Sequence, residues 1–289
     1  MDTPIHFPIF AVNVITEKCE CKDYYGKQVD VMNIAIFQMD IVFGNPEKNY
    51  EKLSEWMKNI NADETDTIVL PELWTTGYDL TRLDEIGDKD GKQTTAFLQK
   101  IAKSYQVNVI GGSFAKQTDE GVFNTMIVVD RNGDLVHEYS KLHLFKLMNE
   151  HHFLQPGKDE PGFLLEGTEF AGFICYDIRF PEWIRKPVLS GAKVIVVSAE
   201  WPSPRIDHWL TLLKARAIEN QSYVIACNRV GSDPDNEFGG RSIVIDPWGK
   251  EIAIASYQEE ILYAEIDLEV SKEVRSRIPV FEDRRPDFY

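Results

Sequence analysis

Short, continuously apolar runs alternate along the chain with segments whose apolar residues recur at helical spacing. Apolar runs of four to eight residues are typical of strands buried on both faces. Such runs occupy residues 32–39, 67–70, 107–113, 123–130, 170–175, 193–197, 223–227, 242–246, 251–255 and 261–266. Asn132-Gly133 separates two of these runs and is a strong signal for a tight hairpin turn. The pattern therefore predicts many strands, some of them paired antiparallel.

Segments with one apolar helical face lie between several of these predicted strands. They occupy residues 46–60, 94–105, 181–190 and 207–219. The first begins favourably, because Asn45 can cap a helix and Pro46 fits its first turn. Helices between strands favour an α/β fold. Sheets that are buried on both faces need helices outside and another sheet inside, so we predict a single-domain, four-layer α-β-β-α sandwich.

The first 31 residues differ from the rest, since they contain two cysteines and show no clear period. We treat residues 1–31 as an N-terminal extension that need not belong to the core, and residues 32–289 as the domain. Met32 is then a candidate functional start. No linker rich in glycine, serine or proline divides the domain.

The chain of 289 residues carries a formal net charge of −16, which disfavours nonspecific binding to nucleic acid or to an anionic membrane. No apolar run is long enough to span a bilayer, and the N-terminus lacks a signal-peptide pattern. The four cysteines are Cys19, Cys21, Cys175 and Cys227. The first two are too close together for an easy disulfide. This usage is typical of a reducing compartment, so we expect a cytoplasmic protein.

Three separate strand ends each present one reactive side chain. Glu72 follows the run 67–70, Lys141 follows Tyr139-Ser140, and Cys175 ends the run 170–175. A thiol can attack an electrophilic carbon, a carboxylate can take its proton, and an ammonium can stabilise the negative charge that forms. Each residue alone has an ordinary structural explanation. Their joint occurrence predicts a nucleophilic site.

Cys175 lies just before the polar stretch Tyr176-Asp177-Ile178-Arg179. A thiol at such a turn can have backbone N–H groups close by, which would form an oxyanion hole. A neighbouring positive charge would lower its pKa and raise the thiolate fraction. The alternative is a buried structural cysteine. Cys227 ends a similar run without the polar sequel, and we interpret it as structural.

The three stretches together resemble the nitrilase (carbon–nitrogen hydrolase) superfamily. Glu72 in LPELWTTGY, Lys141 in YSKLHLF and Cys175 in FICYDIRFPEW match its Glu-Lys-Cys triad motifs in order and approximate spacing. The resemblance extends from about Met32 to the C-terminal RRPDFY and leaves residues 1–31 outside. It implies the four-layer sandwich, a homodimer, and catalysis without a cofactor or metal.

The resemblance also implies a role for each residue. Glu72 takes the proton of Cys175, the thiolate attacks an amide carbon, and Lys141 with the backbone N–H of Tyr176 stabilises the oxyanion. Ammonia leaves, and water hydrolyses the thioester. Glu150 matches a further glutamate that positions the substrate in many members, although the segment around it looks shortened.

Within the superfamily, the motifs look most like those of the omega-amidases, which hydrolyse 2-oxo-dicarboxylic monoamides such as 2-oxoglutaramate. Such a substrate carries a carboxylate, and Arg179 is a candidate partner for it. Arg179 could equally hold the turn. Trp74, Tyr78 and Trp201 are candidate pocket walls, and core packing is the alternative for each.

Other functions remain open at this point. The same triad would serve N-carbamoyl compounds or other aliphatic amides, and the fold could be a non-catalytic scaffold. A zinc site is a further alternative, because several histidines lie close together in the sequence near Glu150. They are His137, His143, His151 and His152, and no H-x-x-x-H or H-E-x-x-H pair occurs among them.

Overall fold

A computed structural model describes residues 31–288 of the chain. The predicted N-terminal extension, residues 1–31, thus lies outside the described residues except for Val31, which begins the first strand. The predicted start of the domain at Met32 falls within that strand. Among residues 31–288, no helix is long and apolar enough to cross a bilayer.

The first sheet has the strand order β13-β1-β2-β4-β5-β6, and a short strand, β3, pairs with β4. Its strands are β1 (Val31–Gln38), β2 (Thr67–Val69), β3 (Asp88–Lys89), β4 (Asn108–Thr118), β5 (Gly121–Val129), β6 (Leu135–Ser140) and β13 (Glu260–Asp267). The predicted hairpin at Asn132-Gly133 joins β5 to β6, which pair antiparallel. Gly133 has φ +82°, a conformation that glycine adopts without steric cost.

The second sheet has the order β12-β11-β10-β9-β8-β7. Its strands are β7 (Gly162–Leu165), β8 (Thr168–Ile174), β9 (Val194–Ala199), β10 (Tyr223–Asn228), β11 (Ile243–Ile245) and β12 (Glu251–Ile254). The central strands β8, β9 and β10 run parallel and are almost completely buried. Burial on both faces explains why their sequences are continuously apolar rather than alternating.

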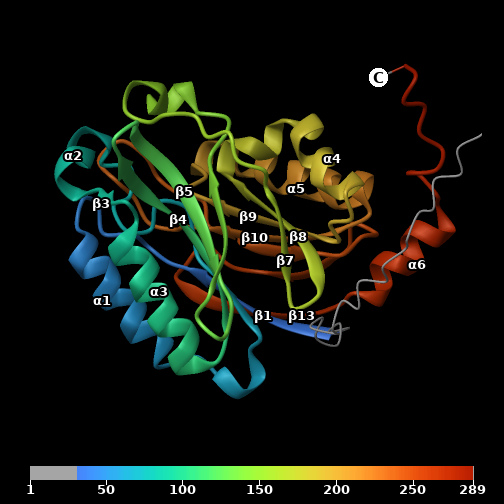
Figure 1. The fold of residues 1–289 in the computed structure, drawn as a ribbon, viewed down its shortest axis with the longest axis horizontal. Coiled ribbons are helices and arrows are strands. Elements are labelled where there is room, and N and C mark those ends of the chain that lie inside the picture. Colours follow the sequence, from blue (N-terminus) through green and yellow to red (C-terminus); the bar gives the residue numbers. More distant parts are fainter. Residues whose placement is uncertain (1–30, 289) are drawn as a thin grey trace, which may run out of the picture.

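Helices lie on the outer faces of the two sheets, and the last helix projects beyond the sandwich (Figure 1). They are α1 (Pro46–Met57), α2 (Leu83–Ile86), α3 (Lys92–Tyr105), α4 (Pro181–Leu189), α5 (Ile206–Asn220) and α6 (Glu269–Arg277). Helices α1 and α3 pack on the first sheet, and α4 and α5 lie on the opposite side of the molecule, against the second. Asn45 caps α1 as predicted, accepting a hydrogen bond from the backbone N–H of Lys48. The α-β-β-α sandwich is confirmed.

The two sheets share one buried core, to which Ile36 and Met126 contribute from the first sheet and Phe173 and Val196 from the second. The strand directions then determine where the reactive residues meet. Strand β2 is parallel to β4, β4 is antiparallel to β5, and β5 is antiparallel to β6. Strands β2 and β6 therefore point the same way, and their C-terminal ends carry Glu72 and Lys141 to one edge of the sandwich.

Candidate active site

Cys175 stands at a sharp turn between β8 and a short 3-10 helix, Cys175–Arg179. The predicted strand 170–175 ends one residue earlier, at Ile174, because Cys175 adopts φ +46°. A positive φ is uncommon for a residue with a side chain, and such conformations cluster at functional sites. The thiol is buried, with 3% of the residue exposed. The turn thus aims the side chain away from the path of the strand.

Asp177 holds this turn to the strand end that bears Lys141. Its Oδ2 accepts hydrogen bonds from Ile174 N at 3.1 Å and from the Tyr139 hydroxyl at 2.8 Å. Its Oδ1 accepts from His143 N at 3.0 Å and lies 2.8 Å from His143 Nδ1. Because Asp177 is fully buried, this carboxylate fixes the relative positions of two segments that are distant in sequence. Nothing in the sequence pattern singled out this role.

Glu72 is fully buried just beyond β2, and both of its carboxylate oxygens accept hydrogen bonds. Lys141 Nζ donates to Oε1 at 2.8 Å, Asn124 Nδ2 at 2.8 Å and the Tyr78 hydroxyl at 3.1 Å. The backbone N–H of Glu200 donates to Oε2 at 2.8 Å. Glu72 also acts on Cys175, since its negative charge helps to raise the pKa of that thiol. The structure therefore brings the carboxylate and the thiol into the same buried site.

Lys141 completes the group, since its ammonium contacts two carboxylates without access to solvent. Nζ donates to Glu72 at 2.8 Å and to Glu150 Oε1 at 2.6 Å, and all three side chains are fully buried. Burial lowers the pKa of Lys141, but the attraction of Glu150 and Glu72 outweighs it and the pKa is raised well above its ordinary value. The ammonium thus stays protonated, as an electrostatic role requires.

Glu150 belongs to the same network, although the segment around it looked shortened. Besides the ammonium of Lys141, its Oε1 accepts a hydrogen bond from the Tyr78 hydroxyl at 2.6 Å. Its Oε2 accepts from Phe145 N at 2.7 Å. Burial raises the pKa of Glu150 in spite of the opposing charge of Lys141. Glu150 is therefore the second carboxylate that contacts the ammonium, and the Tyr78 hydroxyl links it to Glu72.

The pKa of Cys175 corrects one expectation. A neighbouring cation was expected to lower it, yet it is raised well above the ordinary value by burial and by Glu72, which outweigh Lys141. The resting residue is accordingly a thiol. An attack by this sulfur would therefore require a base to remove its proton.

A narrow pocket borders Cys175 and has a cavity volume of about 10 Å³, roughly the space of one water molecule. Its lining consists of Phe145, Cys175, Tyr176, Arg179, Trp201, Pro202 and Arg205. The structure therefore brings Tyr176, Arg179 and Trp201 to the pocket, together with an arginine that sequence reasoning missed.

Two of the three aromatic candidates do not line this pocket. The indole of Trp74 is fully buried, donates to the Gly111 carbonyl at 2.9 Å, and packs against Tyr50 and Phe97. The interpretation of Trp74 as a pocket wall is thus corrected to core packing. Tyr78 takes part through its hydroxyl, which bridges Glu72 and Glu150, and not as an apolar wall. The third candidate, Trp201, does border the pocket.

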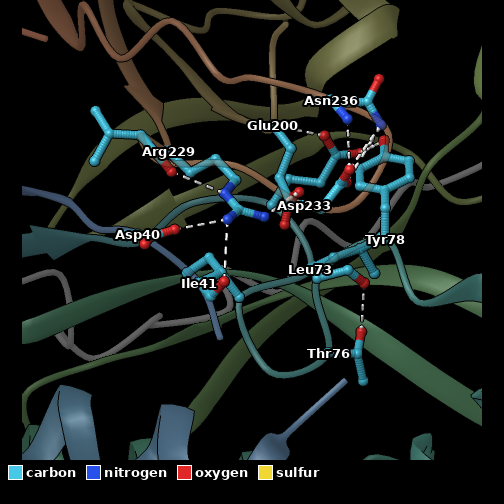
Figure 2. A network of polar contacts seen from close by, with 12 residues as sticks. Asp40, Ile41, Leu73, Thr76, Tyr78, Glu200, Arg229, Asp233 and Asn236 are labelled. Atoms are coloured by element: carbon cyan, nitrogen blue, oxygen red, sulfur yellow. Dashed lines mark hydrogen bonds and ion pairs between the residues drawn. The ribbon is translucent and has the colours of Figure 1, made fainter. Parts of the chain in front are cut away.

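A second buried charge network adjoins Glu72 through Glu200. Arg229 donates to Glu200 Oε2 at 2.9 Å and to Asp40 Oδ1 at 2.8 Å (Figure 2). Burial raises the pKa of Glu200 to about 8, although Arg229 opposes the shift. Glu200 follows the buried strand β9 directly, as Glu72 follows β2. That shared position at a strand end was the signal that could have identified Glu200.

The histidines considered for zinc are dispersed. His143 contacts Asp177 and stacks on Phe180, whereas His137 stacks on Phe163. The rings of His151 and His152 lie next to each other on the exposed surface. Within residues 31–288, no group of three or more His, Cys, Asp or Glu side chains is arranged to hold a metal ion. Cys227 is buried in the shared core, where its Sγ donates a hydrogen bond to the Phe37 carbonyl oxygen at 3.3 Å.

Comparison with known proteins adds to this geometry. Residues 33–276 match the family model described as carbon-nitrogen hydrolase. The chain is 51% identical to the 2-oxoglutaramate amidase of Bacillus subtilis, covering 89% of this chain and 98% of that protein. It is 35% identical to omega-amidase YafV of Escherichia coli K12, covering 87% and 96%.

Solved structures give the same picture of the fold. A Saccharomyces cerevisiae protein, a member of branch 10 of the nitrilase superfamily, superposes with a TM-score of 0.81 at 27% identity. The match covers 89% of this chain and 98% of the yeast chain. The likeness thus includes both sheets and the helices that cover them.

Proposed function

The chain belongs to the carbon–nitrogen hydrolase family and is an amidase, and from this premise we propose that Cys175 forms a thioester with a 2-oxo-dicarboxylic monoamide such as 2-oxoglutaramate. The observation that carries the proposal is the buried ammonium of Lys141 between Glu72 and Glu150, at a site where both Glu72 and Lys141 act on the pKa of Cys175. No cofactor is needed for this chemistry.

In the acylation step, Glu72 takes the thiol proton while the sulfur of Cys175 attacks the amide carbon. The carbonyl oxygen gains the negative charge, which the ammonium of Lys141 and the backbone N–H of Tyr176 stabilise. The tetrahedral intermediate collapses as Glu72 returns the proton to the nitrogen. Ammonia leaves, and the acyl group remains on the sulfur as a thioester.

In the deacylation step, Glu72 takes a proton from water, which attacks the thioester carbon. The products are the free carboxylic acid and the Cys175 thiol, to which Glu72 returns the proton. One carboxylate therefore serves both steps, as microscopic reversibility allows. Glu150 acts by keeping Lys141 charged and oriented toward the site.

The identity of the substrate rests on two supports. Two relatives, at 51% and 37% identity, are named 2-oxoglutaramate amidase, from Bacillus subtilis and Paenarthrobacter nicotinovorans. The pocket supplies a matching charge, because the guanidinium of Arg179 lies 4.8 Å from the centre of the Trp201 ring at the pocket lining. Arg179 would hold the carboxylate at the end of the substrate remote from the amide.

Ammonia release from a panel of small amides, with and without iodoacetamide, tests this function. The panel contains 2-oxoglutaramate, an N-carbamoyl amino acid and an aliphatic amide. Fast release from 2-oxoglutaramate that alkylation abolishes is the expected result. Alkylation-sensitive release from another amide would keep the triad and change the substrate. Absence of turnover on every amide would instead favour a non-catalytic scaffold.

A homodimer and a cytoplasmic location complete the proposal. The resemblance to the superfamily supports the dimer, and the cysteine usage supports a reducing compartment. Light scattering on the purified chain gives its mass in solution directly. A monomer would remove the dimer from the proposal without affecting the chemistry at Cys175.

A further inference from the structure

We propose that Arg205 is a second anion-binding residue of this amidase and that it acts with Arg179 on the carboxylate end of the substrate. The inference rests on the function proposed above and adds a specificity-determining residue to it. The cysteine motif pointed to Arg179, whereas Arg205 lies in a different segment, between β9 and α5. Its place in the site is visible only in the fold.

Arg179, Arg205 and Cys175 all line the same narrow pocket. The aromatic contacts of the two guanidinium groups show how each is held. The guanidinium of Arg179 stacks over the Trp201 ring at 4.8 Å, and that of Arg205 lies 5.6 Å from the centre of the Phe145 ring. Ring faces attract cations and hold a planar guanidinium in place. The aromatic walls thus fix two positive charges beside the nucleophile.

Neither guanidinium has an acidic partner in the part of the chain that the structure describes. The polar contact of Arg179 is with His208 Nδ1, at 3.3 Å. Other buried or half-buried arginines of this protein do pair with carboxylates, as Arg229 pairs with Asp40 and Arg131 with Glu166. Among residues 31–288, Arg241 and Arg275 are also half-buried without a carboxylate contact, but only Arg179 and Arg205 bring two such charges to one pocket beside Cys175.

The backbone at Arg205 strengthens this arrangement. Its carbonyl accepts the Trp201 indole N–H at 2.7 Å, so Arg205 is anchored to the ring over which Arg179 stacks. Arg205 is also the cap residue of α5, a helix of 15 residues, and its side chain extends from the positive end of the helix dipole. Two like charges held this way repel each other, and an anion bound between them would relieve the repulsion.

A 2-oxo acid end fits two guanidinium groups better than one. Its carboxylate can accept a paired hydrogen bond from one arginine, and the adjacent oxo oxygen can accept from the other. The amide end then extends toward Cys175. This division predicts that a substrate with carboxylate and oxo groups gains from both arginines, that one with a carboxylate alone gains less, and that a neutral amide gains nothing.

The test compares Arg205→Gln and Arg179→Gln with the control Arg277→Gln, which removes one charge from an exposed position of α6 outside the pocket. Each is assayed on 2-oxoglutaramate, glutaramate and pentanamide. A hydrogen bond to a charged group contributes about 1.5–3 kcal/mol, or roughly a tenfold to hundredfold change in binding. We expect R205Q to lower kcat/KM at least about tenfold more for glutaramate than for pentanamide, and still more for 2-oxoglutaramate. Equal losses on all three amides would overturn the proposal.

Binding of glutaramate to Cys175→Ala, measured by calorimetry, separates this inference from the proposed function. If the wild-type enzyme does not hydrolyse 2-oxoglutaramate but R205Q still weakens glutaramate binding about tenfold, the anion site stands and the substrate assignment fails. If 2-oxoglutaramate is hydrolysed while R205Q leaves glutaramate binding unchanged, the function stands and the role of Arg205 fails. Arg205→Lys retains charge and should recover part of the affinity, which a purely structural role would not predict.

Discussion

The ammonium of Lys141 donates a hydrogen bond to Glu72 Oε1 at 2.8 Å in a region where neither side chain has any exposed surface. A buried ion pair of this kind loses solvation on both sides, so its stability depends on both partners being present. The stability of this pair also depends on Glu150, because the ammonium of Lys141 contacts that carboxylate as well. The proposed catalytic group is therefore also a structural unit.

Replacing Lys141 with methionine tests that coupling. The change leaves two buried carboxylates without their cation, and we expect it to abolish turnover and to lower the free energy of unfolding by about 3–5 kcal/mol. Urea denaturation followed by circular dichroism measures the second effect. Lys116→Met is the matched control, since Lys116 pairs with the partly exposed Glu138 and should cost at most about 1 kcal/mol. A stable Lys141→Met variant would contradict the buried pair.

Replacing Cys175 with alanine separates chemistry from folding. The substitution removes the attacking sulfur while the turn and its Asp177 anchor remain, so we expect no detectable ammonia release and a cooperative unfolding transition like that of the wild type. Mass spectrometry after incubation with substrate should show an acyl adduct on the wild type alone. Cys227→Ala is the control thiol, since Cys227 is not part of the pocket lining, and it should keep both turnover and the adduct. Residual activity of Cys175→Ala equal to that of the wild type would end the thiol mechanism.

The sequence predicted the layered fold because the central strands are apolar enough to be recognised without knowledge of their neighbours. It also predicted Glu72, Lys141 and Cys175 as site residues, since each stands at a strand end within a stretch that resembles a known motif, and their catalytic roles stay a prediction. Strand bounds were less predictable: the positive φ that ends β8 at Ile174 follows from packing around Cys175 and not from local propensity.

The pattern of apolar and polar positions in the sequence could not identify residues that act through tertiary contacts. The backbone of Glu200 meets Glu72 across 128 positions of sequence, and Asp177 meets Tyr139 across 38. For Trp74 the sequence reasoning erred in the other direction. It interpreted this aromatic residue as a candidate pocket wall, whereas the side chain packs in the hydrophobic core. The sign of the Cys175 pKa shift also needed the structure, since it depends on burial and on two opposing charges together.

The raised pKa of Cys175 gives a prediction for alkylation. Because burial and Glu72 favour the thiol, the rate of inactivation by iodoacetamide should keep rising with pH beyond 9, the ordinary value, without a plateau near neutrality. Glu72→Gln removes the neighbouring negative charge while Lys141 remains, and should shift the curve toward lower pH although the variant no longer turns over. A plateau near pH 7 in the wild type would show that the resting group is a thiolate.

Glu200 gives a prediction for stability against pH. Its folded pKa of about 8 exceeds the ordinary 4.5, so between these values the folded chain holds a proton that the unfolded chain has released. The stabilisation from this group is complete below about pH 4.5 and is lost as pH rises toward 8. Glu200→Gln carries no such proton. We therefore expect the free energy of unfolding of Glu200→Gln to rise relative to that of the wild type as pH increases, by at most about 1.4 kcal/mol per pH unit. Urea titrations at several pH values over that interval measure the difference between the two proteins. A difference that stays constant, or that falls with pH, would mean that Arg229 keeps Glu200 ionised in the folded state.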